Sequence, residues 1–552
     1  MTLGARSFSL TAPSDIHFQL VEVGGCYFNS FKNVYTYPAT PFVSLAIRKL
    51  AKNFNCPLKA SEPFIALAKQ INLIKETKAR CLDAKDLPQP SIRAKDSWEW
   101  QLQAYHNAYP IDAMMWWMGV GTGKSKAAID LIQNKEARRV ILVMPNHILK
   151  DTSCWDYQFE TYMKDDYMLK ILDYHSSKRN AEEASQAMKR FDGSKVPLII
   201  AVNYDSVWRG ELAELLLASK PDLLLMDEIQ KIKSPGGKAS RYMARLAMKS
   251  KQRVGLSGTV MPNSQLDVYG QYRALDPGIF GTSWIRFRDE YAVTFLFNKV
   301  EIIKGYKNQK QLAEKIAPIT VQIDEKVLDL PEPQHDSRIF DLSTDERKVY
   351  DEIEQTYCAQ TLQGYLTITN GLTKVLRLQQ LTGGWLPLRE DNVEAQLKRI
   401  GKSKQDLLHD LLEDIPSDEP VVVFARFKAD LDAVQQTAKN LKRSYGEISG
   451  RTHDKALWDK GGIQILGVNV KSGEGINLTR ASYGIFYSIG YSNGEFEQCV
   501  GRLRRPGMRK FAYFYHLAAR DTVDLAVYRA LKTKQNAREE VVKYLKSLAQ
   551  AA

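Results

Sequence analysis

Cysteine is scarce in this 552-residue sequence, and long apolar runs are missing. The six cysteines lie far apart and form no C-x-x-C pair, so the pattern predicts neither a zinc knuckle nor a disulfide framework. No stretch approaches the roughly 18 uncharged apolar residues of a membrane-spanning helix, and the N-terminus lacks the apolar core of a secretory signal. We therefore expect no membrane partner and a reducing, cytoplasmic location.

Internal repeats and low-complexity tracts are also missing. Hydrophobic residues make up 44% of the chain and charged residues 26%, which is typical of globular proteins. At roughly 150 residues per domain, the length predicts about three or four domains. Lysine and arginine number 77 against 64 acidic residues, an excess of 13 that favours a polyanionic partner such as nucleic acid.

Residues 1–95 are predicted to form a small N-terminal α+β domain. The alternating segment 17–23 indicates a strand with a turn at Gly24-Gly25, and helical patterns follow at 41–54 and 62–80. This part carries 13 basic and 6 acidic residues, a net charge of +7, so we expect it to be an accessory domain that binds DNA. The proline-containing stretch 83–95 is interpreted as a linker.

The rest of the chain is predicted to be α/β, with two lobes built on parallel sheets. Short apolar runs alternate with helical patterns in two series, which is typical of strands buried on both faces. We expect one lobe at 96–330, a second at 331–520 with a join near 331–333, and a C-terminal helix at 521–552. The intervening residues 259–424 indicate mostly helical insertions. The strand-like runs are 113–117, 139–144, 196–202, 223–226, 253–256, 421–424, 462–468 and 483–487.

A glycine-rich loop stands between an apolar run and a helical pattern. It reads Met118-Gly119-Val120-Gly121-Thr122-Gly123-Lys124-Ser125. Glycines let backbone N–H groups turn toward phosphate oxygens, a lysine here reaches the β and γ phosphates, and the serine hydroxyl is a magnesium ligand. Met118 occupies the place of the first glycine of the usual phosphate-loop pattern. The alternative is a Gly-rich connection without function.

Two adjacent acids follow a predicted strand about 100 residues later. Asp227 would hold the magnesium ion and Glu228 would position and deprotonate the attacking water. An acidic pair after a strand also serves as a helix N-cap, and only the preceding phosphate loop makes the catalytic interpretation preferable.

Arginines near the C-terminus complete the candidate site. Arg502 and Arg505 are three apart, so a helix would project both from one face toward a γ phosphate whose charge spreads in the transition state. The alternative is a basic helix that faces water.

In this order the segments resemble the helicase superfamily 2 ATPases, specifically the Swi/Snf-type branch. By this resemblance Asp227 to Gln230 form motif II, Ser257-Gly258-Thr259 motif III and Gln498 to Arg505 motif VI. The branch is indicated by Asp227-Glu228-Ile229-Gln230-Lys231-Ile232-Lys233-Ser234, by the long insertion and by Leu376-Arg377-Leu378-Gln379-Gln380. Gln230 replaces the usual histidine and Ser234 the usual asparagine. The resemblance implies two RecA-like lobes that clasp ATP and Mg²⁺, with Gln101 reading adenine and Gly475 in motif V touching the nucleotide.

The resemblance also implies double-stranded DNA lying across the lobes. Phosphate contacts would come from the motif Ia, Ic, IV and V residues Pro145, Asn146, Asn203, Tyr204, Arg426, Lys471 and Ser472. We expect a DNA-dependent ATPase that translocates on duplex DNA and remodels branched or protein-bound DNA in a bacterium or a virus-infected cell. A strand-separating DNA or RNA helicase and a slow ATP-binding scaffold are the alternatives.

Overall fold

The computed structural model describes residues 7–12, 16–23, 26–81, 85, 87–149, 155–174, 176–262, 264–297, 300–362, 368–387, 397–471, 476–490, 492–506, 508 and 511–532. The chain divides into two compact units, Met1–Val327 and Leu328–Ala552. None of the helices in these residues is long and apolar enough to cross a membrane.

The N-terminal part of the first unit is a small antiparallel sheet covered by helices on one face. Its strands lie in the order β1-β3-β2. Alternate residues of the sheet, among them Phe8, Tyr35 and Tyr37, face the helices and form the core of this part. The elements are β1 (Ser7–Leu10), α1 (His17–Glu22), β2 (Tyr27–Asn29), β3 (Val34–Pro38), α2 (Pro41–Asn53) and α3 (Glu62–Arg80).

The two long helices predicted here are confirmed, but the predicted strand at 17–23 is wrong. That segment is helix α1, because Ile16, Leu20 and Val23 recur with helical spacing and are buried together, whereas Phe18 is 77% exposed. Residues 24 and 25, the predicted turn, lie outside the described residues.

This part also packs on the rest of the first unit. The Thr40 side chain caps α2 by accepting from the Val43 N–H, and the Thr40 hydroxyl donates to Asp276 Oδ1 at 2.8 Å. Ile74 of α3 belongs to the core of the large sheet described next. Whether residues 1–95 fold as a separate domain stays a prediction.

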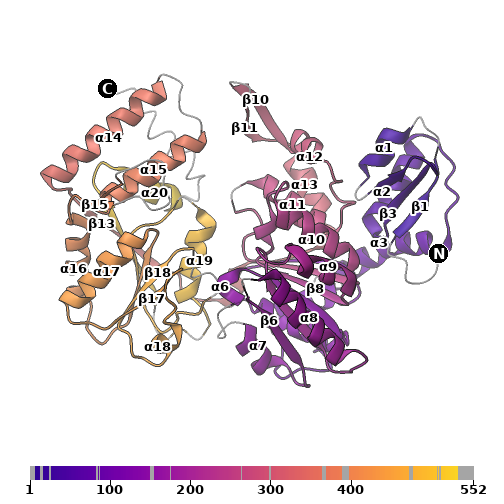
Figure 1. The fold of residues 1–552 in the computed structure, drawn as a ribbon, viewed down its shortest axis with the longest axis horizontal. Coiled ribbons are helices and arrows are strands. Elements are labelled where there is room, and N and C mark those ends of the chain that lie inside the picture. The colour runs from indigo at the N-terminus through magenta and orange to yellow at the C-terminus, as the bar shows by residue number, and fades with distance from the viewer. Residues whose placement is uncertain are drawn as a thin grey trace. The chain divides into compact units, whose positions relative to one another are not determined.

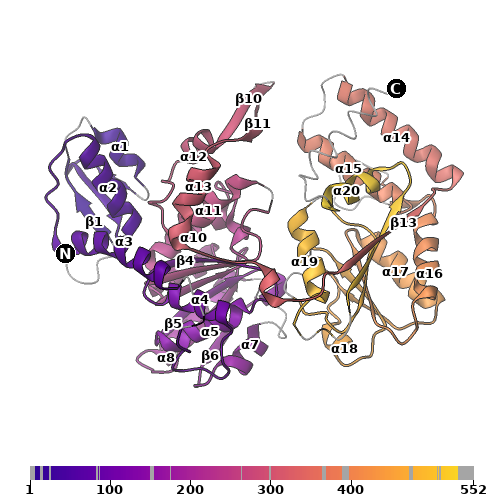
Figure 2. The same cartoon turned by 180° about the vertical axis from the view of Figure 1, so that it is seen from behind.

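The large sheet of the first unit has seven parallel strands in the order β12-β4-β9-β8-β5-β7-β6. Figure 2 shows α4 and α5 side by side on one face, and α8, α9 and α10 lie on the face seen in Figure 1. The strands are β4 (Ala113–Met118), β5 (Arg139–Met144), β6 (Met168–Leu172), β7 (Leu198–Asn203), β8 (Leu223–Asp227), β9 (Gln252–Ser257) and β12 (Thr320–Ile323).

The helices of this unit connect the strands. The α-helices are α4 (Glu99–Ala108), α5 (Lys124–Asn134), α6 (Asn146–Leu149), α7 (Trp155–Tyr162), α8 (Ser177–Phe191), α9 (Gly210–Ser219), α10 (Lys238–Lys249), α11 (Val268–Leu275), α12 (Trp284–Tyr291) and α13 (Gln309–Ile316). Short 3-10 turns are η2 (Ile229–Ile232), η3 (Gln265–Asp267), η4 (Ala317–Ile319) and η5 (Glu325–Leu328).

The insertion at 259–424 is less helical than predicted. It contains a two-stranded antiparallel ribbon, β10 (Ala292–Phe297) and β11 (Val300–Tyr306), which projects beyond α12 in Figure 1. A second short ribbon, β14 (Trp385–Pro387) with β15 (Leu397–Arg399), lies in the second unit. In each ribbon one strand carries charged residues, namely β11 and β15, and β14 and β15 have only three residues each, so the pattern of a buried strand is not continuous.

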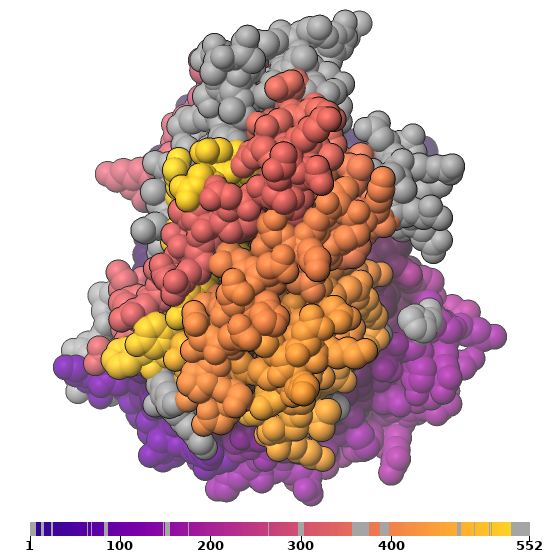
Figure 3. Space-filling view, turned by 90° about the vertical axis from the view of Figure 1, so that its left-hand side faces the viewer, coloured from indigo at the N-terminus to yellow at the C-terminus, as the bar shows by residue number. Residues whose placement is uncertain are grey.

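The second unit is built on a six-stranded parallel sheet in the order β13-β20-β19-β16-β18-β17. Figure 3 shows the orange atoms of α16 and α17 covering one side of this unit. Its other elements are β13 (Gln334–Phe340), α14 (Thr344–Leu362), α15 (Ile368–Thr382), α16 (Ser403–Asp414), β16 (Val421–Ala425), α17 (Lys428–Asn440), β17 (Tyr445–Ile448), α18 (Lys455–Asp459), β18 (Ile465–Asn469), β19 (Tyr483–Phe486), α19 (Asn493–Leu503), β20 (Tyr513–Ala519) and α20 (Val523–Lys532).

Alternating side chains of β16 divide this core into two layers. Val421 and Val423 pack toward α16 and α17, and Val422 and Phe424 pack on the opposite face. The two-lobed parallel α/β fold is thus confirmed. The predicted C-terminal helix begins at Val523 and is described to Lys532, and residues 533–552 lie outside the described part.

Candidate functional site

The glycine-rich loop lies between β4 and α5, as predicted. Met118, which replaces the first glycine, is the last residue of β4 and is fully buried. Gly121 and Gly123 have φ of 82° and 79°, the left-handed region that glycine adopts without strain. A Cβ on Gly123 would lie 2.1 Å from Gln101 Nε2, so any larger residue here would have to displace the Gln101 amide.

Lys124 and Ser125 open helix α5 directly after this loop. Lys124 Nζ donates to the carbonyl oxygens of Met118 at 2.9 Å and Gly119 at 3.2 Å. The Thr122 hydroxyl donates to the same Gly119 oxygen at 2.7 Å, and the Gly119 N–H donates to Ile323 O of β12 at 2.9 Å. These bonds fix a loop whose amides stand at a helix N-terminus, the local geometry that binds phosphate.

Gln101 and two tryptophans lie against the loop from α4. Gln101 is buried, its Oε1 accepts from the Trp98 N–H at 2.9 Å, and its Nε2 donates to Thr122 O at 3.3 Å. Trp100 Nε1 donates to the same Thr122 oxygen at 2.9 Å. Trp98 is 43% exposed beside Trp100, whereas Trp116 of β4 is fully buried in the core. The adenine-reading role of Gln101 stays a prediction.

Asp227 ends strand β8 and is held by three groups. Its Oδ2 accepts from Trp155 Nε1 at 2.9 Å and its Oδ1 from the Glu228 N–H at 3.0 Å. The Tyr204 hydroxyl donates to the Asp227 carbonyl oxygen at 2.9 Å. Burial raises the pKa of Asp227, while the Trp155 hydrogen bond and the nearby charge of Lys124 act in the opposite direction. Sequence reasoning missed Trp155, which is 72 residues away from Asp227.

Glu228 is joined to the loop after β9 through Gln230. Glu228 has φ of 50°, in the left-handed region that non-glycine residues rarely occupy and that clusters at functional sites. Gln230 Nε2 donates to Glu228 Oε2, and the Ser257 hydroxyl donates to Gln230 Oε1 at 2.7 Å. The Thr259 N–H in turn donates to Ser257 Oγ at 2.9 Å. The glutamine that replaces the usual histidine thus connects motif II to motif III.

The oxygen atoms of Asp227 and Ser125 are suitable ligands for a magnesium ion. Asp227 supplies a carboxylate and Ser125 a hydroxyl, both hard oxygen ligands of the kind Mg²⁺ prefers. Each Asp227 oxygen accepts one hydrogen bond, which leaves lone pairs for a cation while fixing the carboxylate. When bound, the ion would neutralise phosphate charge.

Arg502 lies near the end of α19 in the second unit and is only 1% exposed. Its guanidinium lies over the ring of Phe424, 5.9 Å from the centroid. Within the described part of the chain, none of its three nitrogens has a hydrogen-bond partner. A buried guanidinium without acceptors is costly, so Arg502 remains a candidate for binding an anion.

The prediction that one helix projects both arginines is wrong for Arg505. Helix α19 ends at Leu503, and Arg504 has ψ of 85°, outside the helical range. Arg505 follows this break, is half-buried and donates from Nε to Gly501 O at 2.8 Å. Gly475 in motif V lies outside the described residues.

The proposed DNA contacts of the first unit differ in accessibility. Asn146 is exposed, and its Oδ1 accepts from Asn203 Nδ2 at 3.2 Å. Pro145 is buried and accepts from the Ile148 and Leu149 N–H groups at the start of α6. Tyr204 is buried and its hydroxyl is used on Asp227, with burial raising its pKa, so its side chain does not present a phosphate contact.

In the second unit, Lys471 is exposed but Arg426 is largely enclosed. Arg426 has a side chain only 12% exposed and an ion pair with Glu495 at 3.4 Å. Its N–H donates to Ser488 Oγ at 2.8 Å. Ser472 lies outside the described residues.

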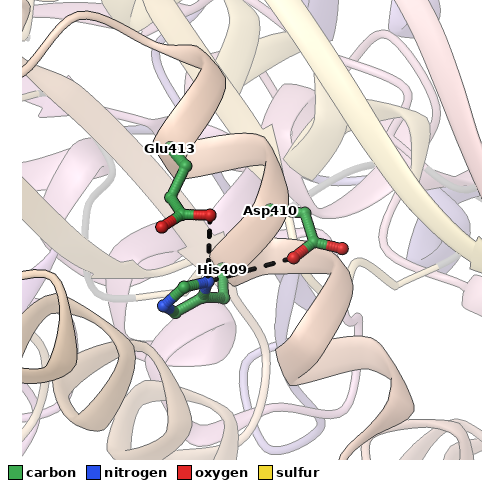
Figure 4. Close-up of side chains that lie close together, drawn as sticks. All are labelled: His409, Asp410 and Glu413. Carbon is green, nitrogen blue, oxygen red and sulfur yellow. Dashed lines mark ion pairs between the residues drawn. The ribbon is translucent and has the colours of Figure 1, made fainter.

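One further cluster of possible metal ligands lies on the surface of α16. Figure 4 shows His409 between Asp410 and Glu413, with Nδ1 to carboxylate distances of 3.9 and 3.7 Å. All three belong to one helix and both acids are exposed. These are ion pairs on a helix surface, and no metal was predicted for them from the sequence.

Comparison with known proteins decides the family. Residues 65–392 match the model of the SNF2-related domain, and residues 403–507 match the helicase conserved C-terminal domain. The chain belongs to the SNF2-related family. It is thereby classed with the ATP-dependent helicase-type enzymes, as the motifs predicted.

Relatives of this SNF2-related chain come from a phage, a bacterium and a vertebrate. Putative protein p41 of Acyrthosiphon pisum secondary endosymbiont phage 1 is 22% identical over 78% of this chain and 94% of its own length. The uncharacterized ATP-dependent helicase YqhH of Bacillus subtilis is 25% identical over 62% of this chain and 64% of its own. The Gallus gallus DNA repair and recombination protein RAD54B is 20% identical over 73% and 48%. The chain thus spans less than two thirds of the two cellular relatives.

Proposed function

We propose that this chain is a DNA-dependent ATPase that translocates on double-stranded DNA and remodels branched or protein-bound DNA. The observation that carries the ATPase part is the joined geometry of the first unit. The phosphate loop with Lys124 follows β4, and Asp227 and Glu228 lie at the end of β8, so all three residues lie at the same edge of the parallel sheet. Its setting would be the cytoplasm of a bacterium or of a virus-infected cell.

The roles of the residues follow from their chemistry. Lys124 gives up its hydrogen bonds to the Met118 and Gly119 carbonyl oxygens and binds the β and γ phosphates instead. Asp227 and Ser125 hold the magnesium ion. Glu228 positions a water molecule and takes its proton, held in place by Gln230. Arg502 and Arg505 supply positive charge to the γ phosphate.

DNA is favoured as the polymer for two reasons. The net charge of +13 favours a polyanion, and RAD54B, a relative over 73% of the chain, is a DNA repair and recombination protein by name. Among the expected contacts, Asn146 and Lys471 are exposed for phosphate binding, with Asn203 fixing Asn146. Tyr204 is left out, and Arg426 contributes only by giving up its Glu495 partner.

Two alternatives remain distinct from this proposal. A strand-separating helicase would use the same ATP site, so only the products of its action distinguish it. A slow ATP-binding scaffold would need neither Glu228 nor the arginines, and the connection of Glu228 to Ser257 through Gln230 counts against it.

An ATPase assay across nucleic acids tests the proposal. We expect turnover of the full chain to rise most with duplex or forked DNA, less with single-stranded DNA and least with RNA. Equal stimulation by RNA would contradict the DNA assignment. A turnover that no nucleic acid changes would favour the scaffold instead.

A further inference from the structure

A groove of about 440 Å³ lies between α2 and α3 in the N-terminal part. Arg48 comes from α2, and Lys69 and Asn72 come from α3. Ile65, Lys69 and Asn72 are spaced four and three residues apart, so one face of α3 presents all three to the groove. Leu58 and Phe64 add apolar walls.

The two cations of this groove have no acidic partner. Arg48 and Lys69 are exposed, and within the described residues neither lies within ion-pair distance of a carboxylate. Other cations of the same unit are paired, as Lys315 is with Glu290 at 3.0 Å, but Lys49 and Lys75 on α2 and α3 also have no ion pair within the described residues. The groove lining therefore distinguishes Arg48 and Lys69 from their neighbours. Two unneutralised cations beside apolar walls concentrate a positive field, which attracts an anion.

The surroundings extend this positive row beyond the groove. Lys52 lies one turn after Arg48 on α2 and is also exposed. The N-terminal 95 residues carry 13 basic and 6 acidic residues, so the excess is +7. Several cations in a row can contact several phosphates at once, so the row suits a polymer of phosphates better than a single small anion.

We propose that the groove between α2 and α3 binds the phosphodiester backbone of nucleic acid. Arg48 donates in a fork to phosphate oxygens, Lys69 acts as a point charge, and the Asn72 amide donates a further hydrogen bond. This rests on the proposed function and gives it a second, sequence-independent contact away from the ATP site.

Charge reversal with a matched control tests the groove. The full chain with Arg48→Glu and Lys69→Glu is compared with Lys49→Glu and Lys75→Glu, which make the same charge change on the same helices outside the groove lining. Binding of a labelled forked duplex is followed by fluorescence anisotropy over a range of KCl. We expect the groove variant to lower the salt slope by about 2, at roughly 0.9 per phosphate contact, with ATPase activity without DNA unchanged in both variants.

Four outcomes would count against the groove or its ligand. Equal losses in the two variants would show diffuse charge rather than a site, and an unchanged slope in the groove variant would show that the groove is not used. Competition by millimolar inorganic phosphate at constant ionic strength would identify a small-anion site instead. Wild-type protein that binds no DNA at all would contradict the proposed function itself.

A separate observation concerns Arg504, which lies between the two arginines of motif VI. It is buried, and its Nε donates to Pro331 O at 2.8 Å. Its Nη2 donates to Leu330 O at 2.8 Å and to Glu332 Oε1 at 3.1 Å. One side chain thus holds the segment at which the second unit begins.

We infer that Arg504 is a positioning residue that couples this connecting segment to motif VI. The three hydrogen bonds of Arg504 tie residues 330–332 to the end of α19. A change in the direction of residues 330–332 therefore also moves Arg502 and Arg505, which flank Arg504 in the sequence. Movement of the units during ATP turnover is then transmitted to the arginines. The inference rests on the proposed ATPase activity.

Arg504→Ala tests the coupling, with Arg504→Lys and Arg520→Ala beside it. Arg520 is a matched surface arginine paired with Asp341. We expect Arg504→Ala to lower kcat about tenfold with the KM for ATP unchanged, because outer contacts of this kind typically contribute ten- to a hundredfold. Cleavage after Glu332 by a Glu-specific protease should respond to a non-hydrolysable ATP analogue in the wild type and not in Arg504→Ala.

Arg504→Lys should stay impaired, since a point charge cannot make three directed bonds, and Arg520→Ala should behave like the wild type. An unchanged kcat together with a preserved cleavage response would overturn the inference, as would full activity of the lysine variant. A wild type without ATPase activity would contradict the proposed function instead.

Discussion

The phosphate loop of the first unit and motif VI of the second hold their cations differently. Lys124 already donates to two backbone carbonyls of its own loop, whereas Arg502 is buried with no acceptor in the described part of the chain. The partners of Lys124 are thus at most six residues away in the sequence, whereas the Arg502 guanidinium packs on the ring of the distant Phe424. We therefore expect nucleotide binding to be a local property of the first unit, and hydrolysis to depend also on the charge of Arg502 in the second unit.

The largest effects should come from separating binding from hydrolysis within the first unit. Lys124→Ala should weaken ATP binding because a phosphate contact is lost, whereas Glu228→Gln should keep binding and abolish turnover because only the base is lost. Titration with a fluorescent ATP analogue and a steady-state assay measure the two effects. Equal loss of nucleotide affinity in both variants would contradict the separate roles.

Arg502→Ala tests whether the buried guanidinium of the second unit takes part in hydrolysis. Turnover should fall about a thousandfold, the lower end for a missing arginine finger, with ATP affinity much less changed. Arg520→Ala is the control for a paired surface arginine. Near-normal turnover of Arg502→Ala would show that the buried guanidinium serves only packing on Phe424.

A smaller effect should come from the connection between motifs II and III. Gln230→Ala should lower kcat roughly tenfold, the low end for residues that orient a catalytic group. Ser257→Ala removes the other end of the same connection, so the double variant should be little worse than either single one. Additive losses in kcat would show that the two residues act separately.

An effect on folding stability rather than on turnover concerns a buried carboxylate behind motif IV. Burial raises the pKa of Asp430 to about 6 from 3.8, with the Ser488 hydrogen bond and Lys404 opposing and Asp524 adding to the rise. Tyr487 also lies beside this carboxyl group. Between pH 3.8 and about pH 6 the folded state therefore binds one more proton at Asp430 than the unfolded state does. The contribution of Asp430 to the free energy of unfolding is fully present below pH 3.8 and is lost as pH rises through about 6.

Asp430→Asn should remove that pH dependence. The free energy of unfolding of the wild type, relative to the variant, should fall by at most about 3 kcal/mol between pH 4 and pH 7. Urea unfolding of both proteins at several pH values measures the difference. A difference that rises with pH would show that Asp430 is stabilised as the anion.

The sequence predicted what local patterns encode and missed what depends on distant partners. The interior strands other than β20 follow from continuous apolar runs, and the phosphate loop follows from glycines next to Lys124. Strand β20 was missed although it lies inside the second sheet. The outer strand β13 was missed because its residues are mostly exposed and polar. Trp155 on Asp227 and Arg504 on Leu330 were missed because they lie 72 and 174 residues from their partners. Helix α1 was taken for a strand because its short apolar pattern fits both periods.

Strand displacement tests the central claim, that this chain tracks along duplex DNA without separating it. The wild-type protein, ATP and either a triplex or a tailed duplex are compared under the same conditions. We expect the third strand to be displaced from the triplex while a long plain duplex stays almost intact. Efficient unwinding of the tailed duplex where triplex displacement fails would contradict the translocase and favour the strand-separating helicase.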